Sequence, residues 1–235
     1  MCEFSLRAAH GTPTIFSDDI LTPFEDIGLG NWPDSRIRKY FAGKTVVDVG
    51  SGLEGIARRL YSIFGASALA PTVININPQF TDWRMIDERV NGVWASRRRY
   101  KQHDLEDGIR ETMQLAGEDY AGYFSQRIAI AALAQQMPIL DNSVDILISS
   151  WAVPTSFYDF GATDRDHIAS YREISRLIGQ KGVALLGPIS KGQFEHVGAM
   201  LDRASEDGMG YVFKDTNSTC GHHRNYTIVM SRPGE

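Results

Sequence analysis

The chain has 235 residues, of which 43% are hydrophobic and 23% charged, a composition that predicts one globular domain and excludes a disordered protein. Its formal net charge of −5 provides no general attraction to nucleic acid or to an anionic membrane, so neither is expected as a partner. The two cysteines lack disulfide or zinc spacing, and the chain has neither a signal-peptide core nor an apolar run of membrane-spanning length, which predicts a cytoplasmic protein without a metal site.

The first thirty residues show no clear hydrophobic period. Pro33 suits the first turn of a helix, and a short helix is predicted over Asp34–Phe41. Gly43 is expected to end this helix just before the first strand of the main sheet.

Lys44–Gly55, with the sequence KTVVDVGSGLEG, is the most informative stretch of the chain. Its valines predict a short buried strand, and three glycines then turn the chain tightly into a helix. Glycine tolerates positive φ and lets a ligand approach the backbone, while the helix start offers free N–H groups. The stretch therefore predicts a small-molecule site at the carboxyl edge of a parallel sheet, built around Asp48, Gly50, Gly52 and Gly55.

Asp48 separates two classes of ligand for this turn. The spacing Gly50-x-Gly52-x-x-Gly55 matches the dinucleotide fingerprint, but a carboxylate two residues before the first glycine would repel a pyrophosphate. The same carboxylate would attract the ammonium group of S-adenosylmethionine (SAM). The pattern V-V-D-V-G-S-G-x-x-G resembles motif I of the class I SAM-dependent methyltransferases, and the resemblance implies that these glycines, Asp48 and Ser51 bind the cofactor.

The second strand is predicted over Thr72–Ile76, after a helix that carries Ile56, Leu60 and Ile63 on one face. In the family, an acidic residue at the end of this strand binds the ribose hydroxyls. Asn75 stands 20 residues after Gly55, where the fingerprint places that acid, and is expected to face the ribose without bringing a charge.

Residues 79–125 form a longer link between the second and third strands than the family usually has, and we expect a mostly helical insertion beside the site. Its run Arg97-Arg98-Arg99 is either an anion clamp or a solvated basic face, and the second interpretation is favoured because charge runs usually are exposed.

A third strand is predicted over Arg127–Leu133, and the following stretch, AQQMPILDNSVD, resembles the family's A-E-x-L-P-F-P-D-N-S-F-D loop. The family has an aspartate where this chain has Leu133. The adenine amino group is therefore expected to bind Gln135 or a backbone carbonyl instead.

The fourth strand, predicted over Asp145–Ser150, leads into four aromatic residues within Trp151–Phe160. The resemblance places the end of this strand near the methionine part of the cofactor and near the acceptor, with Ser150 and Trp151 at the cofactor. The aromatic residues are either a wall around the sulfonium or the hydrophobic base of a lid. Tyr158 or Asp159 is expected to contact an amine or hydroxyl of the acceptor.

The remaining elements alternate between helix and strand. Helices are predicted over Thr163–Ile178 and Phe194–Glu206, and strands over Val183–Gly187, Gly210–Lys214 and Asn225–Met230. This alternation predicts an α/β fold with a doubly wound, mostly parallel sheet. The resemblance adds the family's Rossmann-like, seven-stranded sheet with a reversed seventh strand, and a leader that folds over the site, assigned to residues 1–42. Phe16, Phe24 and Trp32 are either part of that lid or pack on the edge of the sheet.

The function expected from the resemblance is SAM-dependent methyl transfer to a small-molecule metabolite. The alternative is an enzyme that uses SAM alone or attacks its aminocarboxypropyl chain, including an intramolecular cyclisation, and releases methylthioadenosine. Asp48 disfavours a nicotinamide oxidoreductase, and the departures at Asn75 and Leu133 leave a non-catalytic binding module as a further reading. The acceptor and the oligomeric state are left open.

Overall fold

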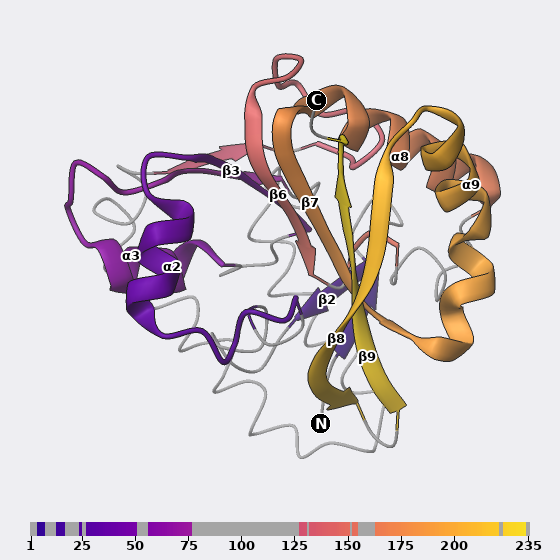
Figure 1. Ribbon diagram of the computed structural model, residues 1–235, viewed down its shortest axis with the longest axis horizontal. Helices are drawn as coiled ribbons and strands as arrows, with labels where there is room; N and C mark the ends of the chain where they lie inside the picture. Colours follow the sequence, from indigo (N-terminus) through magenta and orange to yellow (C-terminus); the bar gives the residue numbers. More distant parts are fainter. Residues whose placement is uncertain are drawn as a thin grey trace.

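The computed structural model of the chain describes residues 4–7, 13–16, 24, 27–50, 56–76, 127–130, 132–150, 152–154, 163–220 and 223–233 (Figure 1). These segments form one large sheet with helices on both sides and a small separate pair of strands. The expected insertion over residues 79–125 lies outside the described residues.

The large sheet has the strand order β5-β4-β3-β6-β7-β9-β8. Strands β3 to β7 run parallel to one another, whereas β9 runs antiparallel to both β7 and β8. The predicted α/β fold with a mixed, largely parallel sheet is therefore confirmed. The strands are β3 (Thr45–Val49), β4 (Thr72–Ile76), β5 (Arg127–Ile130), β6 (Val144–Ser150), β7 (Ile178–Ser190), β8 (Gly210–Cys220) and β9 (His223–Ser231).

Helices cover the two faces of the sheet and create two hydrophobic cores. Alternate residues of a strand point to opposite faces, so Val46 packs with α2 (Asp34–Phe41) and α3 (Ala57–Phe64), while Val47 packs with the opposite core. That second core is formed with α8 (Asp164–Leu177), the 3-10 helix η2 (Lys191–Val197) and α9 (Gly198–Glu206). In Figure 1, α2 and α3 lie at the left and α8 and α9 at the right.

Most predicted elements are present, and several differ in length. The helix Asp34–Phe41 and the strand Thr72–Ile76 have the predicted bounds. By contrast, β5 ends at Ile130 rather than Leu133, and the predicted helix Phe194–Glu206 is replaced by η2 followed by α9. The backbone N–H of Ser190 donates to the side chain of Gln193, which starts the 3-10 turn three residues earlier than predicted.

The last three strands are longer than predicted because they pair with neighbouring strands beyond the predicted ends, β7 with β6 and β9, and β8 with β9. Strand β7 begins directly after α8 and continues through Lys181-Gly182, where a turn was expected, with an irregular register between its pairs to Val144 and Ile146. Strands β8 and β9 extend as a long antiparallel pair as far as Cys220 and His223.

The N-terminal segment contains two strands that the sequence did not predict. β1 (Phe4–Arg7) and β2 (Pro13–Phe16) pair in antiparallel register. Phe24 is buried in the core, with its ring 6.2 Å from that of Phe41, and Trp32 packs edge-on against Tyr40 at 5.3 Å. These contacts correspond to the packing interpretation of the two residues, whereas the side chain of Phe16 lies outside the described set.

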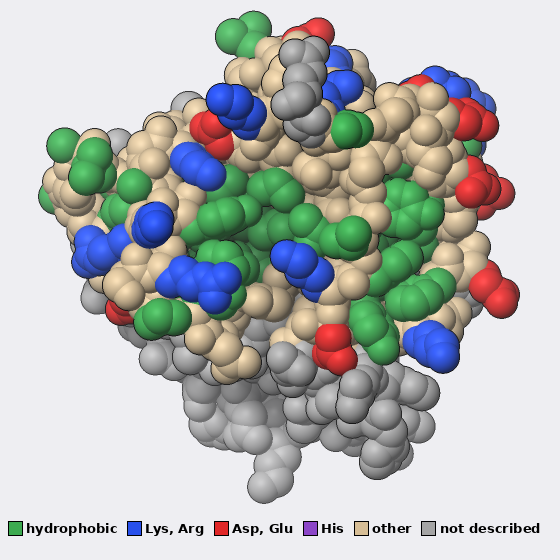
Figure 2. Space-filling model, in the orientation of Figure 1, with side chains coloured by type: hydrophobic (Ala, Val, Ile, Leu, Met, Phe, Trp, Pro, Cys, Tyr) green, Lys and Arg blue, Asp and Glu red, His purple; other side chains and the backbone are tan. Residues whose placement is uncertain are grey.

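One face of the sheet carries a visible apolar surface. Figure 2 shows hydrophobic side chains gathered between α2 and the pair β8–β9. Val212 of β8 is 54% exposed and stands opposite Val229 of β9. Within the described segments, no helix combines the length and the apolar character needed to span a membrane.

Candidate functional site

The chain order of the strands defines a switch point at the centre of the sheet. From β3 the chain continues outward to β4 and β5, whereas β6 lies on the other side of β3 and leads to β7. Asp48 pairs in register with Asn75 of β4 and with Ile148 of β6. In open α/β sheets, ligands bind outside the carboxyl ends of the strands at such a switch point.

The carboxylate of Asp48 is held at this point. Its side chain is 1% exposed, and Oδ2 accepts a hydrogen bond from the backbone N–H of Ile56 at 2.9 Å. Ile56 precedes the first residue of α3, so the carboxylate lies at the positive end of the helix dipole. The turn between Asp48 and Ile56 contains Ser51, Gly52 and Gly55, which lie outside the described residues. Their role in cofactor binding therefore stays a prediction.

Gly50 packs the turn after β3 against the turn after β6. Its φ is +73°, and a Cβ at this position would lie 2.1 Å from Cβ of Ala152. Its N–H donates to the carbonyl of Ile76 at 2.7 Å, and the hydroxyl of Ser149 accepts from the N–H of Val153 at 2.8 Å. The carboxyl ends of β3, β4 and β6 are thereby tied together, and only glycine fits at position 50.

Three neutral polar side chains near the same edge have buried atoms that lack hydrogen-bond partners in the described part of the chain. The unpaired atoms are Nδ2 and Oδ1 of Asn75, Oε1 of Gln135 and Oγ of Ser150. Each such atom costs about 1–3 kcal/mol if it is left unpaired, so a ligand that pairs them would recover that energy. The three residues belong to β4, to the loop after β5 and to the end of β6, so the central carboxylate of Asp48 has neutral polar groups on both sides.

Sequence reasoning identified Asp48, Gly50, Asn75, Gln135 and Ser150, and the structure brings their strands together at one edge. Sequence reasoning missed Ala152. Its small side chain lies beside Gly50, and nothing in the sequence indicates that the two turns touch. Trp151, Tyr158 and Asp159 lie outside the described residues, as does the run Arg97-Arg98-Arg99. Within the described ranges, no group of three His, Cys, Asp or Glu side chains is placed to hold a metal ion.

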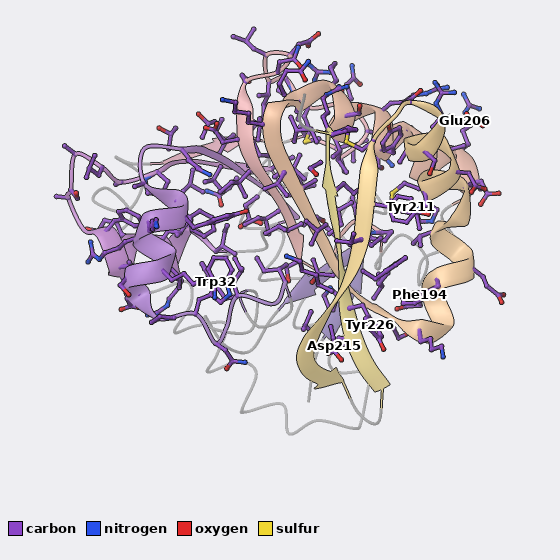
Figure 3. The ribbon with its side chains drawn as sticks, in the orientation of Figure 1. Trp32, Phe194, Glu206, Tyr211, Asp215 and Tyr226 are labelled. Carbon is purple, nitrogen blue, oxygen red and sulfur yellow. The ribbon has the colours of Figure 1, made fainter. Side chains whose placement is uncertain are left out.

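A half-buried aromatic group lies farther along the carboxyl edge. Phe194 of η2 stacks on Phe213 at 4.4 Å and meets Tyr226 edge-on at 5.3 Å. Tyr226 pairs with Ile189 near the end of β7. Figure 3 shows Phe194 and Tyr226 close together beside Asp215, with Trp32 on the α2 side of the molecule.

No family model matches the sequence, and no curated protein matches it. Solved structures do match. The [4+2]-cyclase SpnF has a TM-score of 0.50 at 12% identity, over 85% of this chain and 81% of that protein. A TehB-like SAM-dependent methyltransferase from Corynebacterium glutamicum has a TM-score of 0.49 at 14% identity, over 85% and 87% of the two chains. A SAM-dependent methyltransferase from Aquifex aeolicus has a TM-score of 0.48 at 16% identity, over 92% and 98%.

These similarities concern the fold alone. The matching solved structures include SAM-dependent methyltransferases, the family that the motifs of this chain resemble.

Proposed function

We propose that this chain is a SAM-dependent transferase that methylates a small-molecule metabolite. The observation that carries the proposal is the buried carboxylate of Asp48, fixed beside a glycine turn at the switch point of the sheet. A pyrophosphate over this turn would be repelled, whereas an ammonium group would be attracted.

The unpaired polar atoms support the same ligand. SAM combines a charged amino-acid part with a neutral nucleoside whose hydroxyl and amino groups need partners. Asn75 is proposed to bind the ribose, Gln135 the adenine, and Ser150 and Trp151 the methionine part, with Asp48 opposite the ammonium. The glycine turn, with Gly50, Ser51, Gly52 and Gly55, is proposed to admit the ligand close to the backbone.

When bound, SAM supplies an electrophilic methyl group on a sulfonium. The protein's part is then to orient the acceptor in line with that group at about 3–3.5 Å, which needs no general base for an amine, thiol or carboxylate acceptor. Tyr158 and Asp159 are proposed to contact the acceptor. Within residues 1–42, the part before the buried Phe24 is proposed to form a lid over this single domain, and residues 79–125 an insertion beside the site. Both are proposed to exclude water from the site.

Calorimetry tests the cofactor. We expect SAM and its demethylated product, S-adenosylhomocysteine, to bind, and NAD and NADP to bind much more weakly. Tight binding of NADP without binding of SAM would refute the proposed function.

A second candidate uses SAM without a separate acceptor. SpnF shares the fold and is named as a cyclase, so the fold alone does not determine which bond is made. In this alternative the cofactor's own amine attacks the aminocarboxypropyl carbon bound to sulfur and loses a proton to solvent, the carbon–sulfur bond breaks, and methylthioadenosine leaves. Incubation of the enzyme with SAM alone, followed by mass spectrometry, separates the two. Enzyme-dependent methylthioadenosine without S-adenosylhomocysteine would support the alternative over methyl transfer.

A further inference from the structure

The loop between β5 and β6 is held against helix α8 by Arg176. Its Nη2 donates to the carbonyl of Met137 at 2.8 Å, and its Nη1 donates to the carbonyl of Ile139 at 2.7 Å. Nη1 also pairs with the carboxylate of Asp141, and Nε pairs with Glu173 one turn earlier on α8. One guanidinium therefore fixes three successive points of the loop.

Glu173 binds the same loop through the backbone N–H of Met137, and we call Arg176 and Glu173 together the clamp. Its Oε1 accepts the backbone N–H of Met137 at 2.7 Å. Both backbone polar groups of Met137 are thus bound by side chains of α8, and the Met137 side chain is 2% exposed. Gln135, whose Oε1 is buried and unpaired among the described residues, lies only two residues before this anchored point.

The contacts suit positioning better than general stabilisation. The hydrogen bonds that Arg176 donates to Glu173 and then to Asp141 raise the pKa of its guanidinium above the usual value, so the group stays charged. The side chain of Asp141 is 68% exposed, and an ion pair at this exposure adds little to stability. The bonds to the Met137 and Ile139 carbonyls, by contrast, are directional and fix where the loop backbone lies.

We propose that Arg176 and Glu173 are positioning residues that hold Gln135 in place for the nucleoside end of the ligand. This inference rests on the proposed function, because it assigns the ligand contact to Gln135. The side chains of the clamp act through the loop backbone and need no contact with the ligand.

The test compares SAM affinity in Arg176→Lys and Glu173→Gln with that in Arg203→Lys. Lysine cannot donate to Met137, Ile139 and both carboxylates in the same geometry, whereas glutamine keeps an acceptor for the Met137 N–H and is the milder change. Arg203 is a matched control because its ion pairs with Glu206 and Asp207 lie within and directly after α9. Calorimetry should show about five- to tenfold weaker binding for Arg176→Lys, a smaller loss for Glu173→Gln, and no change for Arg203→Lys.

A double-mutant cycle with Gln135→Ala separates positioning from a merely structural role. If Arg176 acts through Gln135, the loss caused by Arg176→Lys should disappear once Gln135 is alanine. The urea midpoint of each variant is measured as well, so that SAM affinities are compared only between folded proteins. Additive losses, a Gln135→Ala variant with wild-type affinity, or lowered stability with unchanged affinity would each overturn the inference while SAM binding by the wild type upholds the proposed function. Absence of SAM binding by the wild type would refute both.

Discussion

The carboxylate of Asp48 and the backbone N–H of Ile56 are joined by a buried hydrogen bond of 2.9 Å, which connects the end of β3 to the start of α3. The residue that is proposed to attract the ligand's ammonium group therefore also holds the two ends of the glycine turn together. Its structural and electrostatic roles can be separated by substitution.

Asp48→Asn keeps an oxygen that can accept from Ile56 but removes the charge, whereas Asp48→Ala removes both. We expect both variants to bind SAM about 1–3 kcal/mol more weakly, because a charge-assisted contact is lost. Only Asp48→Ala should also lose about 1–3 kcal/mol of folding stability, because the buried N–H is left unpaired. Calorimetry and urea unfolding measure the two effects. Wild-type affinity in both variants would contradict the role of the charge.

The contact between Gly50 and Ala152 predicts a steric effect that can be isolated. Gly50→Ala places a Cβ 2.1 Å from that of Ala152, in addition to the strain of a positive φ. Gly43→Ala is the matched control, because its φ is +66° and its Cβ would meet nothing within 4 Å. We expect about 1–2 kcal/mol of destabilisation for Gly43→Ala from strain, and about 1–3 kcal/mol more for Gly50→Ala from overpacking.

Urea unfolding measures both glycine variants. Adding Ala152→Gly to Gly50→Ala should recover part of the additional loss, because it removes the methyl group that collides. Equal destabilisation by Gly43→Ala and Gly50→Ala would show that the two turns adjust without cost.

Asn75 should show opposite effects on folding and on binding. It is 2% exposed, and neither side-chain polar atom has a partner among the described residues. Asn75→Leu replaces them by apolar atoms of similar size, so the ligand-free protein should become about 1 kcal/mol more stable or stay unchanged. SAM should bind more weakly, because the ribose loses its proposed partner. Urea unfolding without SAM measures the stability, and the additional stability in the presence of SAM reports its affinity. Unchanged affinity would show that another residue holds the ribose.

Local sequence patterns predicted the elements that form the centre of the sheet. Runs of apolar residues predicted β3 and β4, the glycines predicted the turn after β3, and the helical spacing of apolar residues predicted α8. The candidate residues Asp48 and Asn75 followed from their places at strand ends, and the register places them opposite each other.

Features that depend on contacts between distant segments did not follow from the sequence. The extra length of β8 and β9 depends on their pairing with each other, and the β1–β2 pair has no hydrophobic period. Ala152 is 102 residues from Gly50 in the chain, and Met137 is 36 from Glu173, so neither contact has a local signal. For Phe24 and Trp32 the sequence left two interpretations open, a lid and packing on the edge of the sheet, because an aromatic side chain suits both.

The hydrogen bonds at the start of α8 predict that the folded protein becomes less stable at acidic pH. Oδ2 of Asp166 accepts from the backbone N–H of Thr163 at 2.9 Å and from its hydroxyl at 2.7 Å. These bonds, the backbone one first, lower the pKa of Asp166 in the folded state. Its contribution to stability is therefore present above the unfolded pKa of about 4 and is lost as the pH falls through the lower folded value.

Urea unfolding at pH 7 and pH 3 tests this dependence. Asp166→Asn should be less stable than the wild type at pH 7, and the difference should shrink at pH 3. Thr163→Val keeps the backbone donor and removes the hydroxyl, so its loss at pH 7 should be smaller than that of Asp166→Asn. A difference that stays constant with pH would contradict the role of the ionised carboxylate.

A test of the proposed lid compares two truncations of the N-terminal segment, because the lid lies directly before a part of the segment that is buried in the core. Phe24, Ile27 and Leu29 are at most 5% exposed, and they pack in the core with α2 and α3. Each contributes about 1.5–3 kcal/mol by burial, and their sum approaches the whole stability of an ordinary domain, about 5–15 kcal/mol. Removal of residues 1–30 should therefore unfold the protein and reveal nothing about a lid.

Removal of residues 1–22 keeps these three side chains and tests the lid directly. We expect the shortened protein to unfold at a urea concentration close to that of the wild type, because the core with α2 and α3 is intact. Its SAM affinity and its methyl-transfer rate should fall, because water enters a site from which the lid is proposed to exclude it. Wild-type activity in a folded 23–235 protein would show that the leader takes no part in the reaction.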